Sequence, residues 1–140
     1  MSFEWSEYLE FSKELIYPTG RYLNPANEAA LRASTSRVYY AVFCSSRNYL
    51  RDVERDYIVI KTYNNDTSEL KRRGLTIHQY VQNEFNADPA KRSIANNMKR
   101  LKFRRVKADY HDDYANISKE IKTSISYAKK ALDELNKLTP

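Results

Sequence analysis

Glycine and proline, the residues that most often mark turns, are scarce in this chain. It has two glycines and four prolines in 140 residues, and neither type occurs between positions 26 and 53. A β-sandwich or barrel needs a turn about every 8–12 residues, so this scarcity excludes those folds. It excludes collagen-like and low-complexity chains for the same reason. Hydrophobic residues make up 41% of the chain, enough for a core, and the length suits a single domain over residues 1–140.

Helical periodicity occurs in segments that are joined by short connections. One of them begins with Thr76 and Gln79 at the spacing of a capping box, in which a hydroxyl and an amide satisfy free backbone groups. The last has the clearest pattern, with apolar residues recurring every three or four positions from Ile117 to Leu135. The sequence therefore predicts an all-α bundle. The expected helices cover residues 2–16 up to Pro18 and Gly20, about 26–53 after an Asn24-Pro25 cap, 76–88, about 90–110, and a last one starting near 112–113.

Residues 54–74 lack this periodicity. Tyr57 to Ile60 combine aromatic and β-branched side chains, a composition that favours a strand. The stretch from Tyr63 to Ser68 is polar and rich in turn-forming residues. We therefore expect an exposed loop or a short hairpin here.

Residue counts exclude several classes of protein. One cysteine, Cys44, excludes an internal disulfide framework, and one Cys with two His is too few for the four N or S ligands of structural zinc. No stretch approaches 18 apolar residues, and the first ten residues hold three glutamates without the basic region of a signal peptide. We therefore expect a cytoplasmic protein with no membrane span, no bound metal and no cofactor.

Positive charge is concentrated in one segment. The formal net charge is +6, and residues 91–107 contain eight Lys or Arg and no acidic residue. On a helix, Arg100, Arg104 and Lys107 share an outward face, and Lys102 lies in the same segment. Such a segment favours binding of RNA phosphates, which would position RNA without reading its sequence. The alternative is a solvated helix face.

Three segments together are similar to a known family. They are Ala33 to Phe43 (ASTSRVYYAVF), His78 to Phe85 (HQYVQNEF) and Leu101 to Tyr110 (LKFRRVKADY). In this order they resemble the short stand-alone HEPN (higher eukaryotes and prokaryotes nucleotide-binding) proteins of bacteria and archaea, over about residues 3–137. The resemblance implies an up-and-down bundle of four or five helices that often forms a homodimer. It also implies a metal-independent endoribonuclease of toxin or antiviral-defence type, or an inactive member that binds RNA, a nucleotide or a protein partner of nucleotidyltransferase or antitoxin type.

The same resemblance points to two catalytic residues. Active HEPN proteins use an Arg and a His separated by four to six residues, and this chain offers Arg105 and His111 with five between them. His111 can converge on Arg105 if the helix ends at Tyr110, because six residues of continuous helix would rotate it about 120° away. Arg105 also lies one turn before Asp109 on an apolar face, so the alternative is a structural Arg–Asp pair.

Three further residues are expected to support this site. Arg37 lies on a stripe of small residues, and the resemblance favours a structural role in which it pairs across the bundle with Asp109. His78, at a predicted helix start, is expected to be a structural hydrogen-bonding imidazole, because the positive end of a helix disfavours imidazolium. Tyr110 is expected to pack in the core.

Metal-free cleavage of RNA requires a base, a cation and an acid. Histidine suits proton transfer near neutral pH, and arginine offers a permanently charged, planar fork to phosphate. One Arg and one His per chain are few, which favours a symmetric homodimer that brings two pairs to one cleft. Val106 favours the inactive alternative, because active family members often have a polar residue after the Arg. The Asp112-Asp113 pair favours it too, because acidic residues beside the site repel RNA.

Overall fold

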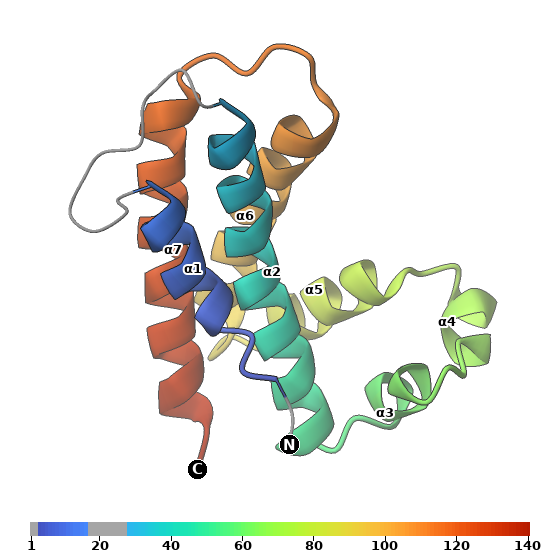
Figure 1. The fold of residues 1–140 in the computed structure, drawn as a ribbon. Helices are drawn as coiled ribbons and strands as arrows, with labels where there is room; N and C mark the ends of the chain where they lie inside the picture. Colours follow the sequence, from blue (N-terminus) through green and yellow to red (C-terminus); the bar gives the residue numbers. More distant parts are fainter. Residues whose placement is uncertain (1–2, 17–27) are drawn as a thin grey trace.

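The computed structural model describes residues 3–16 and 28–140, and all regular secondary structure within these ranges is helical. The predicted all-α class is therefore confirmed, with more helices than the five expected. The ends predicted at Pro18 and Gly20 and the cap predicted at Asn24-Pro25 lie outside the described residues. The helices are α1 (Glu7–Ile16), α2 (Glu28–Asp52), α3 (Tyr57–Tyr63), α4 (Ser68–Arg73), α5 (Ile77–Ala87), α6 (Arg92–Tyr110) and α7 (Ile117–Leu138), as Figure 1 shows.

Helix α2 lies at the centre of the arrangement. Helices α1, α6 and α7 all pack against it, and α5 packs against α6 (Figure 1). Val38, Val42 and Leu50 of α2 are almost completely buried, as expected for a helix with apolar residues on much of its circumference. Small side chains let α1 approach closely: the Ser12 hydroxyl donates to the Ser34 carbonyl over 3.3 Å.

Helices α6 and α7 complete the core. The inner face of α6 is the predicted one, because Ile94, Met98 and Leu101 are each about 1% exposed. Helix α6 also ends at Tyr110 as predicted. The predicted start of α7 near residues 112–113 is wrong. Helix α7 begins at Ile117, directly after Asn116, which has a left-handed conformation with φ 60°.

The loop or hairpin predicted for residues 54–74 is also wrong, because this segment forms the helices α3 and α4. The Asp56 carboxylate accepts hydrogen bonds from the backbone N–H groups of Ile58 (2.9 Å) and Val59 (3.2 Å), so it caps α3. This cap outweighs the strand preference of the β-branched residues that follow. Figure 1 shows α3 and α4 projecting to one side of the bundle, next to α5.

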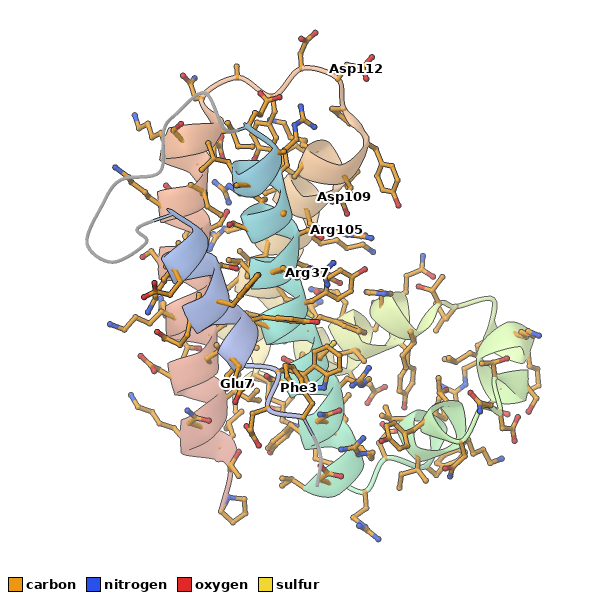
Figure 2. All side chains as sticks on the ribbon, viewed as in Figure 1. Phe3, Glu7, Arg37, Arg105, Asp109 and Asp112 are labelled. Carbon is orange, nitrogen blue, oxygen red and sulfur yellow. The ribbon has the colours of Figure 1, made fainter. Side chains whose placement is uncertain are left out.

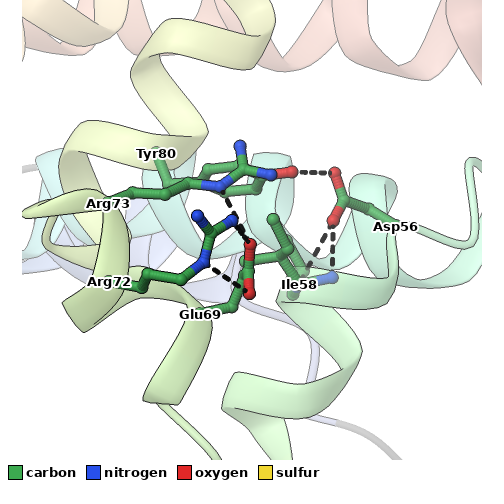
Figure 3. A network of polar contacts seen from close by, with 7 residues as sticks. Asp56, Ile58, Glu69, Arg72, Arg73 and Tyr80 are labelled. Carbon is green, nitrogen blue, oxygen red and sulfur yellow. Dashed lines mark hydrogen bonds and ion pairs between the residues drawn. The ribbon is translucent and has the colours of Figure 1, made fainter.

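A polar network holds this projection against α5 (Figure 3). The Tyr80 hydroxyl donates to the second carboxylate oxygen of Asp56 over 2.7 Å. Burial and this neighbouring carboxylate raise the pKa of Tyr80, which keeps the phenol protonated as a donor. Within α4, Glu69 binds the guanidinium groups of Arg72 and Arg73. Asp56 is therefore both the cap of α3 and its tether to α5.

We predict that Asp56→Ala lowers the free energy of unfolding by about 2 kcal/mol, since it removes a helix cap and the partner of the Tyr80 hydroxyl. Asp66→Ala is the matched control. Asp66 accepts from the backbone N–H and the hydroxyl of Ser68 at an exposed position, so its loss should lower the free energy of unfolding much less. Urea unfolding monitored by circular dichroism measures both. Equal losses in the two variants would contradict the tether.

Candidate functional site

Arg105 is held where α6 faces α2, and its side chain is 17% exposed. Its Nε lies 3.0 Å from Oδ2 of Asp109, one turn later, so the predicted ion pair is present. Its Nη2 donates to the Tyr40 hydroxyl of α2 over 3.0 Å. Its buried Nε forms the ion pair without hydrogen-bond geometry, and within the described residues no hydrogen bond is found at Nη1. Two edges of the guanidinium therefore have partners, and Nη1 keeps its donors for an anion.

Aromatic rings surround this guanidinium. Its carbon lies 5.3 Å from the ring centre of Tyr40, 5.8 Å from that of Tyr39 and 6.0 Å from that of Tyr110. Tyr39 is buried, whereas Tyr110 is 72% exposed. The prediction that Tyr110 packs in the core is wrong: Ala108 covers the inner side of the last turn of α6 and is 4% exposed, so Tyr110 lies on the outward side of that turn. The exposed ring of Tyr110 lies beside the Arg105 guanidinium.

Asp109 and Arg37 are arranged differently from the expectation. The Asp109 carboxylate, which pairs with Arg105, also lies 3.5 Å from the Ser36 hydroxyl of α2. The Arg37 guanidinium carbon instead lies 5.3 Å from the ring centre of Tyr8 and 5.7 Å from that of Tyr40. Arg37 points toward α1 through these cation–π contacts, and within the described residues it forms no ion pair with Asp109. Figure 2 labels Arg37, Arg105 and Asp109 along this side of the bundle.

His78, at the start of α5, is hydrogen-bonded as expected. Its Nδ1 lies 2.7 Å from the Tyr39 hydroxyl, and its ring stacks on Phe43 with 4.0 Å between centres. Burial, and then the positive charges of Lys102 and Arg105, lower the pKa of His78 to about 4. The imidazole is therefore neutral near neutral pH. His78 adds no positive charge next to Arg105.

His111 lies directly after the end of α6. Its backbone N–H donates to the Lys107 carbonyl over 3.1 Å, and its backbone is extended, with φ −93° and ψ 132°. This helical hydrogen bond and the φ keep the His111 side chain in the register of α6, whereas the extended ψ redirects only the chain after it. The rotation of about 120° from Arg105 therefore remains, and the expected convergence is not met. The imidazole is exposed, and it has no hydrogen bond or ion pair to any residue that the structure describes. The structure brings Arg105 and His111 to the same end of α6 without direct contact between their side chains.

Arg32 is a residue of this region that the sequence analysis missed. From the start of α2, its Nη1 donates to the carbonyls of Ala108 (2.9 Å) and His111 (2.6 Å), and its Nη2 donates to that of Asp112 (3.0 Å). The last carbonyls of a helix lack partners within the helix, so this guanidinium caps the C-terminus of α6 from a different element. Arg32 thereby fixes the backbone that carries His111. A sequence offers no local signal for a contact across more than 70 residues.

The predicted outward basic face is largely engaged with neighbouring side chains. Arg104 is 18% exposed, and its Nε binds Oε2 of Glu120 on α7 over 2.6 Å. Arg100 donates to the Asn97 side chain over 3.1 Å, and its guanidinium lies over Tyr127. Lys107 lies over the rings of Phe103 and Tyr114. Arg100 and Arg104 therefore face α7, whereas Lys102 lies near His78.

Comparison of the chain with protein-family models, curated proteins and solved structures gives no match. Among the residues that the structure describes, no helix has the length and apolar character needed to cross a membrane. Over the same residues, His, Cys, Asp and Glu form no group of three or more that could hold a metal ion.

We predict that Arg32→Ala lowers the free energy of unfolding by about 2 kcal/mol and accelerates amide hydrogen exchange at residues 108–113, because the carbonyls at the end of α6 lose their donor. Arg92→Ala is the control. Arg92 is exposed and donates to one backbone carbonyl, that of Asn86, over 3.2 Å, so its loss should cost about 0.5 kcal/mol. Unchanged exchange at 108–113 in Arg32→Ala would show that Arg32 does not fix this segment.

Proposed function

We propose that this chain is a HEPN-type helical protein that cleaves RNA without a metal ion. The observation that carries the proposal is the setting of Arg105, whose guanidinium is held by Asp109 and Tyr40 and has no hydrogen bond at Nη1 within the described residues. His111 lies at the end of the same helix, at the spacing of the Arg–His motif that the family resemblance provides. A fixed, partly buried cation binds phosphate better than a mobile surface one, since less ordering entropy is lost.

The proposed reaction uses the 2′-hydroxyl of RNA as its nucleophile. His111 removes the proton, the 2′-oxygen bonds to phosphorus, and the bond from phosphorus to the 5′-oxygen breaks. Arg105 stabilises the negative charge that develops on the non-bridging oxygens. An acid protonates the leaving 5′-oxygen, which gives a 2′,3′-cyclic phosphate and a 5′-hydroxyl.

The acid in this scheme is the second copy of His111 in a symmetric homodimer. One chain supplies one Arg–His pair, whereas the reaction needs a base and an acid on opposite sides of the phosphorus. An isologous contact near the end of α6 would place two pairs around one cleft. The basic residues Arg100, Arg104, Lys107 and Lys102 would contribute to the positive field that attracts RNA.

A second candidate is a non-catalytic interaction module of the same family. It is favoured by the carboxylates around the site: Asp109 already neutralises Arg105, and Asp112 and Asp113 are exposed next to His111. Such a module would bind RNA, a nucleotide, or a protein partner of nucleotidyltransferase or antitoxin type. The two candidates differ in whether RNA is cut.

We predict that the parent protein cuts single-stranded RNA in EDTA and leaves the equivalent DNA intact, because DNA lacks the 2′-hydroxyl. Arg105→Ala and His111→Ala should each reduce the cleavage rate at least about 100-fold, through lost charge stabilisation or lost proton transfer. Lys71→Ala, at an exposed position of α4, is the control and should cut at the parent rate. Gel analysis of an end-labelled RNA measures the rates, and intact RNA with the parent would favour the interaction module.

We predict that light scattering at micromolar concentration gives twice the mass of one chain. Mixing equal amounts of inactive Arg105→Ala and inactive His111→Ala chains tests the shared cleft. A mixed dimer has one intact Arg and one intact His, a pair that neither variant homodimer has. The mixture should therefore cleave faster than either variant alone but slower than the parent, which has the second His as acid. A monomeric mass at these concentrations would contradict the shared cleft.

A further inference from the structure

Phe103 has an unusual position for a large apolar side chain. It lies in the middle of α6 and is 67% exposed, more than any other phenylalanine of the chain. Three of its four neighbours one turn away along the helix are cationic: Lys99 and Arg100 precede it, and Lys107 follows it, whereas Val106 is apolar. The Lys107 ammonium lies 5.6 Å from the centre of the Phe103 ring. A solvent-exposed aromatic ring is thus framed by positive charge.

A hollow of about 410 Å³ lies beside this ring, between α6 and α7. Tyr127 also lines it, and the guanidinium groups of Arg100 and Arg104 lie 5.3 and 5.1 Å from the centre of the Tyr127 ring. The ring of Tyr127 is therefore covered by two arginines, whereas the Phe103 ring has one cation over it, Lys107, and remains 67% exposed. The residues that line the hollow are Lys99, Arg100, Phe103, Arg104, Glu120 and Tyr127.

The charge of this hollow is positive. Its one carboxylate, Glu120, is bound by Arg104 over 2.6 Å. Within the described ranges, Lys99, Arg100 and Lys107 form no ion pair, so three positive charges remain around Phe103. Cations beside an open aromatic ring are what proteins use to hold a single-stranded nucleic acid, because phosphates bind the cations and a base stacks on the ring.

We propose that Phe103 and the hollow beside it form a second contact site for single-stranded RNA, in which an unpaired base stacks on the Phe103 ring. Lys99, Arg100 and Lys107 bind the flanking phosphates. Positions 103 and 105 are about 200° apart around α6, so this contact lies on a different face from Arg105. The inference rests on the proposed RNA function and adds a place where the RNA is held outside the cleavage site. Base pairing would hide the faces of the bases, so duplex RNA does not fit.

The test measures binding of fluorescent RNA by anisotropy, in EDTA. The probes are a 2′-O-methyl adenosine oligomer, which cannot be cleaved by 2′-oxygen attack, and an abasic oligomer with the same number of phosphates. Phe103→Ala is compared with Phe103→Trp, which keeps a stacking ring. Phe11→Ala is the matched control, because Phe11 is also exposed (53%) but lies on the acid-rich α1.

Stacking predicts that Phe103→Ala weakens binding of the adenosine oligomer at least about fivefold, with the dependence on salt unchanged. Phe103→Trp and Phe11→Ala should bind this oligomer as tightly as the parent, and Phe103→Ala should bind the abasic oligomer as the parent does. Equal affinity of the parent for the two oligomers would show a general anion-binding surface and overturn the proposal. Parent affinity in Phe103→Ala would overturn it too, while leaving cleavage at Arg105 intact. A parent that binds neither oligomer would overturn both this site and the proposed function.

Discussion

The burial of α2 on most of its circumference is the constraint on which the rest of the structure depends. Val38, Val42 and Leu50 are fully enclosed because α1, α6 and α7 pack against the same helix. This packing fixes the line along which α6 runs beside α2. Side chains from α2 can then reach the inner face and the end of α6, so the candidate site is a direct consequence of the core.

The arginines near the contact between α2 and α6 have different kinds of partner. Arg32 donates to backbone carbonyls at the end of α6, and Arg37 lies over aromatic rings. Arg105 pairs with one carboxylate and one hydroxyl. A guanidinium that is partly buried needs such partners, because an unpaired buried charge is costly. The neutral His78 fits this surplus of cations, since another positive charge would raise the cost further.

The parts of the fold that follow from short-range patterns could be predicted. The capping box formed by Thr76 and Gln79 and the end of α6 at Tyr110 are both present. Residues 54–74 could not be predicted, because the decisive interaction is the side chain of Asp56 reaching the backbone ahead of it and Tyr80. The Arg105–Asp109 pair could also be predicted, because the two residues are one turn apart on the same helix. The role of Arg32 depends on how two distant helices pack, and such a contact leaves no pattern in the sequence.

The central claim is that RNA phosphate binds at Arg105, near the end of α6. The most direct measurement is an NMR titration of the ¹⁵N-labelled protein with a short 2′-O-methyl RNA. The account predicts shifts of the Arg105 side-chain Nε–H signal and of the amides of Tyr110 and His111, with α3 and α4 unchanged. Unchanged Arg105 and His111 signals at saturating RNA would contradict it.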